Sequence, residues 1–266
     1  MNFLLITLKS YRRGGLLDGA KDPKRRESVL MQFKRFQVIA QEVEDLFKKY
    51  DIKRISMVLG IDCTASNTWS GKKSFGGKNL HHISRDNLNF YEQAFGILGS
   101  VVERFDASKS IPSYFFGDRD GGKESVTPLF HDKDTGSDAL PSLDMVLRMY
   151  RRKIKIVKLG GHTSFVPLIK KTIEIVSKSR VFHILVIIGD GGVTDIKANS
   201  EAVCMASEYP LGILFVGVGD GDYKDNPKDP WYRMKQLADE LPNRKFDNFN
   251  FILVKPDMPP EEFAKK

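Results

Sequence analysis

Short apolar runs alternate with amphipathic stretches between residues 54 and 254, and this pattern predicts the secondary structure. Strands are predicted at residues 55–62, 111–116, 181–188, 211–218 and 249–254, with a short edge strand at 126–130. Apolar residues that recur every three or four positions predict helices at 88–105, 140–150, 165–176, 196–207 and 230–241. Two of the strands, 181–188 and 211–218, are apolar on both faces, as in a parallel sheet covered on both sides. The alternation predicts an α/β fold, a doubly wound and mostly parallel sheet with helices on both faces.

The chain before residue 51 has a different character. Residues 28–50 carry one apolar stripe and predict an amphipathic helix that docks on the domain. Nine Lys/Arg and three Asp/Glu lie between Lys9 and Arg35, a local net charge of +6. This 9–35 arm is either a solvated tail or a contact for acidic partners or an anionic surface. The predicted organisation is a basic arm with a helix at 1–50, one domain at 51–256 and a tail at 257–266.

Composition narrows the class of protein. The 266 residues have 42 Lys+Arg and 34 Asp+Glu, a net charge of +8, and 41% are hydrophobic, enough for a full core. We expect no transmembrane segment, because no apolar run approaches the roughly 18 residues of a membrane span. We expect no secretory signal, because the apolar stretch at the N-terminus is too short and no small-residue cleavage site follows it. Two cysteines make neither a disulfide framework nor a zinc site. An intracellular location is expected, whether cytoplasmic, nuclear or membrane-peripheral.

Polar residues gather where the predicted strands end, which is where ligands bind in doubly wound sheets. Five of them form a set that offers only oxygen ligands, two carboxylates and three hydroxyls: Asp62, Thr64, Ser66, Thr163 and Asp190. Hard oxygen ligands suit Mg²⁺, Mn²⁺ or Ca²⁺. Two carboxylates leave such an ion able to accept a further carboxylate from another protein. The alternative is that the hydroxyls only cap the next helix.

The remaining motifs do not indicate catalysis or nucleotide binding. The glycines at 217, 219 and 221 are spaced G-x-G-x-G after a late strand, which favours a turn with positive φ over a dinucleotide site. No P-loop motif is present. An Asp62 phosphoryl-transfer enzyme would need a second acid where Thr64 stands. We therefore predict no catalytic residue in this chain.

Three further side chains and one basic run have structural interpretations. His183 is interpreted as a core histidine, His162 as a neighbour of the site, and Cys63 as a buried thiol facing away from Asp62. Six bases and no acid occur between Arg148 and Lys158, and we interpret them as a solvated helix end. Neither aromatic interleaving nor a recognition motif accompanies the basic charge, so no specific nucleic-acid binding is predicted.

The order Asp62-x-Thr64-x-Ser66, then Thr163, then Asp190 resembles the metal-ion-dependent adhesion site of von Willebrand factor A-type domains, which have a Rossmann-like sheet. Further segments are similar to copines, at residues 60–67, 80–83, 91–94, 116–117, 161–165 and 216–220. Residues 69–75 and 246–251 most resemble the plant RING-type copine-like ubiquitin ligases. The resemblance covers about residues 52–256.

This resemblance implies a function and a ligand set. Thr64, Ser66 and Thr163 would be hydroxyl ligands, Asp62 and Asp190 would bind directly or through water, and Asp195 would be an outer-shell candidate. The implied cation is Mg²⁺ first, with Mn²⁺ and Ca²⁺ as alternatives. The implied function is cation-dependent capture of an acidic residue of a partner protein.

The departures from the family pattern bear on enzymatic activity. Copines carry C2 domains before this region, and the plant ligases end in a RING that two cysteines cannot supply. We therefore expect a binding module and not an enzyme. The alternatives are a substrate-binding component of a copine-like ubiquitin ligase system, and attachment to an anionic surface through the basic arm.

Overall fold

The computed structural model describes residues 54–84, 88–102, 110–179, 181–220, 231–239, 241 and 243–253. The predicted basic arm, the 28–50 helix and the 257–266 tail lie outside these residues. The division into 1–50, 51–256 and 257–266 therefore stays a prediction.

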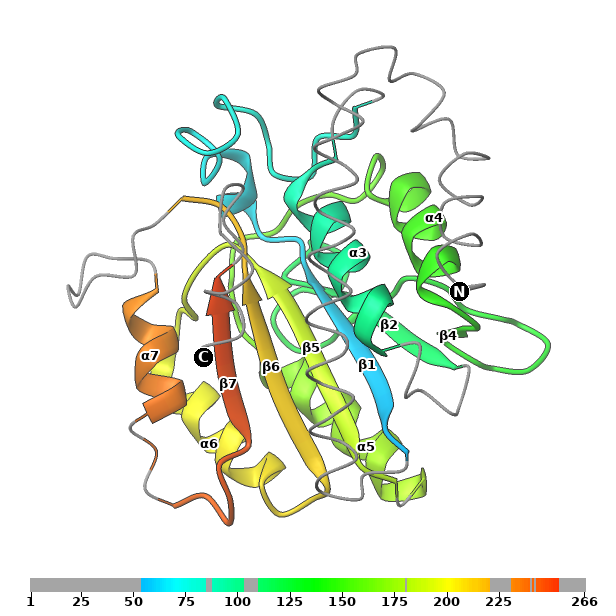
Figure 1. Ribbon diagram of the computed structural model, residues 1–266, viewed down its shortest axis with the longest axis vertical. Helices are drawn as coiled ribbons and strands as arrows, with labels where there is room; N and C mark the ends of the chain where they lie inside the picture. The colour runs from blue at the N-terminus through cyan, green and yellow to red at the C-terminus, as the bar shows by residue number, and fades with distance from the viewer. Residues whose placement is uncertain are drawn as a thin grey trace.

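A mostly parallel sheet forms the centre of the described structure (Figure 1). Its parallel strands are β1 (Ser56–Asp62), β2 (Ile111–Phe116), β5 (His183–Gly189), β6 (Leu211–Gly217) and β7 (Phe249–Leu253). Two short strands, β3 (Thr127–Pro128) and β4 (Ala139–Leu140), pair antiparallel with β2. The strand order is β3-β2-β1-β5-β6-β7, with β4 beside β2. This confirms the predicted doubly wound fold.

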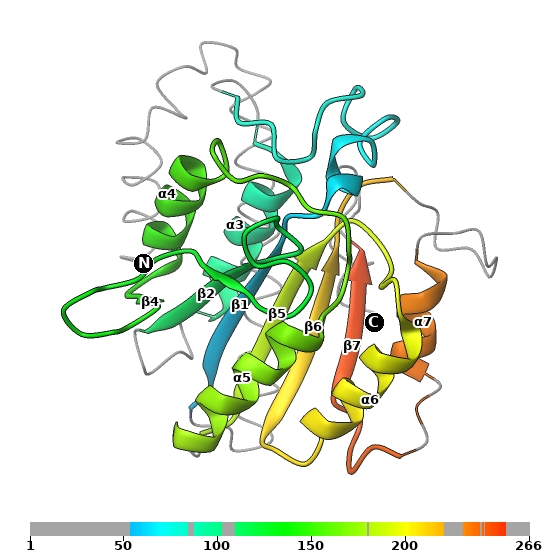
Figure 2. The same cartoon turned by 180° about the vertical axis from the view of Figure 1, so that it is seen from behind.

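Helices cover both faces of the sheet, as Figures 1 and 2 show from opposite sides. The helices are α3 (Phe90–Val102) and α4 (Leu143–Lys153) on one face, and α5 (Val166–Ser179), α6 (Ile196–Ala206) and α7 (Tyr232–Asp239) on the other. In β1, Leu59 and Ile61 join the buried cluster beneath α3 and α4, whereas Val58 joins the cluster beneath α5 and α6. The central strand is therefore apolar on both faces because it contributes to two cores.

The helix boundaries differ from the predicted ones for local reasons. The predicted helix 140–150 was wrong at its start, since Leu140 belongs to β4 and α4 begins at Leu143. Ser142 caps α4 by accepting a hydrogen bond from Met145 N. Helix α3 begins at Phe90 because Asn89 and Glu92 form a reciprocal capping box. A 3-10 helix, η1 (Ala65–Thr68), was not predicted.

Candidate metal centre

The candidate site lies where the direction of sheet building reverses. After β1 the chain adds β2 on one side, and after the α4 and α5 helices it adds β5 on the other side of β1. The carboxyl ends of β1 and β5 therefore meet at a topological switch point, the usual ligand position in such folds. Asp62 is the last residue of β1, and Asp190 directly follows β5.

A chain of short hydrogen bonds joins four of the five predicted ligands. Thr64 Oγ1 lies 2.8 Å from Ser66 Oγ, which donates to Asp190 Oδ1 at 2.8 Å. The single Ser66 proton is used on Asp190, so the Thr64 hydroxyl is the donor in the first bond. The Thr64 N–H donates to Asp62 Oδ1 at 2.8 Å. The two hydroxyls of the segment that follows β1 thereby connect the Asp62 end of β1 with Asp190 after β5.

Each of the two carboxylates retains one oxygen without a partner. Asp62 Oδ2 and Asp190 Oδ2 are both buried and make no hydrogen bond. Burial, and then repulsion from Asp190, raises the pKa of Asp62 to about 8, although hydrogen bonds from Thr64 oppose the rise. Burial also raises the pKa of Asp190, although the hydrogen bond from Ser66 opposes the rise. Two adjacent buried carboxylates with unpaired oxygens are unfavourable unless a cation or a proton neutralises them.

The hydroxyls do not serve as helix caps, which was the alternative interpretation. Thr64 precedes η1 at the N-cap position, but its side chain makes no capping hydrogen bond there. Its hydroxyl is turned to Ser66 instead. The donor set of carboxylates and hydroxyls fits a hard divalent cation. Among the residues that the structure describes, no three His, Cys, Asp or Glu side chains gather as a metal cluster, so any ion here depends on the hydroxyls.

Thr163 belongs to a third loop that is tied to the first two through its backbone. Gly160 pairs with Thr64, accepting from Ala65 N and donating to Cys63 O. Thr163 exchanges two hydrogen bonds with Thr194, which follows β5. No hydrogen bond between described residues joins the Thr163 hydroxyl to the other four predicted ligands. Its part in cation binding therefore stays a prediction.

Asp195 has a structural task. It is the N-cap of α6, where its Oδ1 accepts a hydrogen bond from Ala198 N at 3.0 Å. This accounts for the carboxylate without a cation, and the outer-shell role expected of Asp195 remains untested.

Two glycines leave room for the site. A Cβ on Gly189 would lie 2.9 Å from Asp62 Oδ2, closer than real Cβ atoms come. Gly117 has a φ of 72°, and a Cβ there would strike the methyl group of Thr64. Any larger residue at either position would displace a predicted ligand.

A buried polar network supports the end of β1 from the α3 side, and sequence reasoning assigned it no role. His81 Nε2 lies 2.8 Å from the carbonyl oxygen of Asp62, and His81 Nδ1 lies 2.9 Å from the Tyr150 hydroxyl. Tyr91 stacks on His81 and donates to Asn67 Oδ1. Burial lowers the pKa of His81 to about 3, so its ring is neutral. The sequence hinted at this network only through the copine-like segments at 80–83 and 91–94. The spacing of these segments along the chain did not show that they pack against the end of β1.

The same network continues into an ion pair between a buried Glu92 and a half-buried Arg151. The Tyr150 hydroxyl accepts from Asn89, which shares the α3 capping box with Glu92. Glu92 is fully buried and accepts from Arg151 Nε at 2.5 Å. The prediction that the whole 148–158 run is solvated was therefore wrong for Arg151, although Arg148, Arg152, Lys155 and Lys158 are exposed.

Several other sequence predictions are confirmed. Cys63 is fully buried, and His183 is buried with Nδ1 bonded to Val181 O. Gly219 has a φ of 100°, as expected of a turn glycine, whereas Gly217 ends β6 without a positive φ and residue 221 lies outside the described residues. His162 is exposed in the third loop, directly before Thr163.

A separate observation concerns membranes: none of the helices among the described residues has the length and apolar character needed to span one.

Comparison with known families decides the assignment. The copine family profile matches residues 79–265, more than half of the chain. The chain belongs to the copine family. The copine domain is 40% identical over 210 residues to copine family protein 1 of Caenorhabditis elegans, covering 79% of this chain and 18% of that protein.

Other relatives also match this copine domain over only part of their own length. Copine family protein 2 of C. elegans is 35% identical, covering 86% of this chain and 3% of the relative. E3 ubiquitin-protein ligase RGLG3 of Arabidopsis thaliana is 36% identical, covering 82% of this chain and 59% of the relative. The chain thus spans less than two thirds of the length of these curated relatives.

Two solved structures with a distant resemblance to the copine domain are informative about the fold alone. The manganese-loaded TRAP protein of Plasmodium vivax matches with a TM-score of 0.45 at 10% identity, covering 75% of this chain and 68% of that one. Mussel byssus proximal thread matrix protein 1 with a zinc-occupied MIDAS motif matches with a TM-score of 0.45 at 14% identity, covering 80% and 43%. Similarities this low carry no argument about the site.

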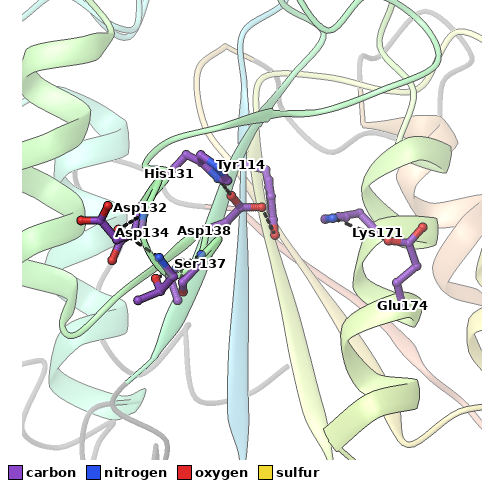
Figure 3. Close-up of polar contacts among 10 residues, drawn as sticks. Tyr114, His131, Asp132, Asp134, Ser137, Asp138, Lys171 and Glu174 are labelled. Carbon is purple, nitrogen blue, oxygen red and sulfur yellow. Dashed lines mark hydrogen bonds and ion pairs between the residues drawn. The ribbon is translucent and has the colours of Figure 1, made fainter.

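The copine domain has a second polar cluster, away from the carboxyl ends of β1 and β5 (Figure 3). Hydrogen bonds within the cluster are sufficient to explain its polar side chains. Asp138 accepts from Tyr114 and lies 2.7 Å from His131 Nδ1. Asp132 accepts from the backbone N–H groups of Asp134 and Thr135. The cluster braces the connection between β3 and β4 against β2, and we assign it no ligand.

Proposed function

We propose that this copine domain binds a divalent cation and, through it, captures an acidic residue of a partner protein. One observation carries the proposal: two neighbouring carboxylates at the switch point each bury an oxygen that has no partner. Mg²⁺ is the first candidate, with Mn²⁺ and Ca²⁺ as alternatives, because the donors are all oxygen atoms. The residues that would hold the cation are Asp62, Thr64, Ser66, Thr163 and Asp190.

A cation suits these two carboxylates better than any group of the chain itself. The Asp62 and Asp190 side chains already use their other oxygens on Thr64 N and Ser66 Oγ. These bonds hold both carboxylates in place before any ion arrives. The bound ion supplies positive charge that offsets the desolvation of both groups.

The composition of the site favours completion by a partner. Five side chains are available, whereas Mg²⁺ takes six ligands and Ca²⁺ takes six to eight. Three of the five are uncharged hydroxyls, so a further carboxylate is electrostatically acceptable. An aspartate or glutamate from another protein fits that position.

The cation is tested by thermal unfolding with and without Mg²⁺, Mn²⁺ or Ca²⁺. At 100 times the dissociation constant, the cation should stabilise the wild type by about 2.7 kcal/mol. Asp62→Ala and Asp190→Ala should abolish this shift. Asp134→Ala is the control, since it removes an exposed carboxylate from the connection between β3 and β4 and should keep the cation-induced shift. An undiminished shift in both site variants, with the fold intact, would exclude the site.

Partner capture is tested with pull-downs in Mg²⁺ and in EDTA, using wild type and Asp62→Ala. Proteins held only by the wild type in Mg²⁺ are then changed at single Asp or Glu residues. One such change should abolish binding. If binding persists in EDTA, or no acidic residue of the partner matters, capture through the cation is wrong.

A second candidate is a substrate-binding component of a ubiquitin ligase system. The observation that favours it is the 36% identity to E3 ubiquitin-protein ligase RGLG3. In that role the chain would hold a substrate through the same site, with ubiquitin transfer supplied from elsewhere. The full gene product and its domains distinguish this candidate from an independent binding module. An intracellular location stays a prediction for both.

A further inference from the structure

We infer that residues 69–78 form a docking rim beside the cation site that selects an acidic partner segment containing an apolar side chain. In this inference Trp69 receives the apolar residue, and the lysines of the rim attract additional carboxylates next to the one captured. The inference rests on the proposed function and names the class of partner for the same site.

Trp69 is placed next to the site by the turn that carries Ser66. The Trp69 N–H donates to the Ser66 carbonyl at 2.9 Å, and Ser70 donates to the same carbonyl through both its N–H and its hydroxyl. Trp69 is 54% exposed, whereas the chain's other tryptophan, Trp231, is fully buried. An exposed tryptophan one turn from a cation ligand offers a large apolar surface with little rotamer freedom, the usual character of an interface hot spot.

The charge of the rim complements an acidic segment. Residues 63–84 contain three lysines and no acidic residue, and Lys72, Lys73 and Lys78 are all exposed. A partner that brings one carboxylate to the cation would bring its neighbouring residues over this rim. Acidic neighbours would be attracted there and basic ones repelled.

The rim is held in place from the other side of the site. Asp220, which follows β6, accepts hydrogen bonds from Lys73 N, Ser74 N and Ser74 Oγ. The Asp220 N–H donates to Ser70 O at 2.7 Å. The end of the rim is fixed as well, since Leu80 N donates to Asn67 O.

This anchoring separates the backbone of the rim from its lysine side chains. The Asp220 carboxylate is occupied mainly by backbone N–H groups and a serine hydroxyl, so the lysine side chains stay exposed. A surface ordered before binding loses less conformational entropy on binding. The rim therefore has the features of a recognition surface: fixed backbone, exposed tryptophan and one sign of charge.

Immobilised nine-residue peptides test the inference. Each contains one fixed Asp in a Gly/Ser background, with Glu, Lys, Phe or Leu placed at each flanking position. In Mg²⁺ the wild type should prefer Glu and Phe or Leu over Lys. Trp69→Ala should lose the apolar preference, about 10-fold in affinity. Lys72→Glu/Lys73→Glu should lose or reverse the preference for Glu.

Matched controls separate the rim from general surface effects. Phe182→Ala removes another exposed aromatic residue, 40% exposed, at the opposite end of the sheet. Lys170→Glu/Lys178→Glu removes the same charge from the exposed face of α5. Both should leave peptide preferences unchanged, and all variants should keep the cation-induced thermal shift.

Different failures have different meanings. If the fixed Asp is needed in Mg²⁺ but flanking preferences are absent, or survive in both rim variants, the docking rim is wrong and the proposed function stands. If Asn replaces the fixed Asp without loss, the proposed function itself fails. Binding to acidic peptides that persists in EDTA and vanishes at high salt would indicate a plain electrostatic surface, and would overturn the inference.

Discussion

At the scale of single residues, the site is defined by small distances that allow little substitution. Asp62 keeps its carboxylate at the end of β1 only because the neighbouring strand presents a glycine there. A Cβ on Gly189 would meet Asp62 Oδ2 at 2.9 Å. The backbone of Gly189 does not have positive φ, so conformational freedom is not what demands glycine. Glycine is required at this position because it leaves space for the Asp62 carboxylate.

Gly189→Ala should therefore weaken cation binding without unfolding the protein. The added methyl group moves the Asp62 carboxylate, and disturbing a ligand in this way lowers metal affinity by about 10-fold or more. Calorimetric titration with Mn²⁺ measures the change. Gly212→Ala is the control, because its Cβ would meet its nearest neighbour, Phe182, at an ordinary 3.5 Å. Equal affinities in the two variants would contradict the explanation.

At the scale of elements, α3 and α4 are joined by an ion pair between a buried Glu92 and a half-buried Arg151. Glu92 closes the α3 capping box with one carboxylate oxygen and accepts from Arg151 of α4 with the other. Because Glu92 is fully buried, the guanidinium is the charge that makes its burial tolerable. Its neighbour Arg152 is exposed.

Arg151→Ala should reduce the free energy of unfolding by about 3 kcal/mol, since it leaves Glu92 buried and unpaired. Arg152→Ala should change it by less than about 0.5 kcal/mol, as exposed substitutions usually do. Urea unfolding of both variants measures the difference. The double variant Arg151→Ala/Glu92→Gln should recover part of the loss, and similar values for the two arginines would disprove the pairing argument.

Helices and strands were predictable from the sequence where their apolar residues follow a clear periodicity. They were not predictable where pairing with a distant part of the chain determines the secondary structure. Strands such as β5 and β6 are apolar on both faces, so their position and burial followed from the sequence. The pair of residues that form β4 carries no strand pattern, because only its pairing with β2 makes it a strand. The candidate site was predictable in outline, since strand ends locate Asp62 and Asp190. The support from His81 was not, because it comes from a loop that periodicity does not describe.

At the scale of the whole molecule, the site and the global stability are linked through protons. The folded protein without cation holds a proton at Asp62 up to about pH 8, because burial and then Asp190 raise the pKa. The unfolded chain loses that proton near pH 4. His81 acts in the opposite sense, since burial lowers its pKa to about 3 from an unfolded value near 6.5.

Without cation, stability should therefore fall between about pH 6.5 and pH 8. In that window the folded state binds more protons than the unfolded state through Asp62, while His81 is neutral in both. The slope for one group is at most about 1.4 kcal/mol per pH unit. Below pH 6.5 the His81 effect opposes it. Denaturant unfolding in EDTA measures the slope, which Asp62→Asn or saturating Mg²⁺ should flatten; a slope unchanged by both would refute the assignment to Asp62.

The position of His81 has a consequence for how the site can be observed. The Asp62 carbonyl can only accept a hydrogen bond, so the Nε2 atom of the neutral ring must carry the proton. Nδ1 must then accept from the Tyr150 hydroxyl. The imidazole is locked in one tautomer, with its N–H directed at the backbone of a predicted cation ligand. Its nitrogen resonances would report events at the cation site from the protein interior.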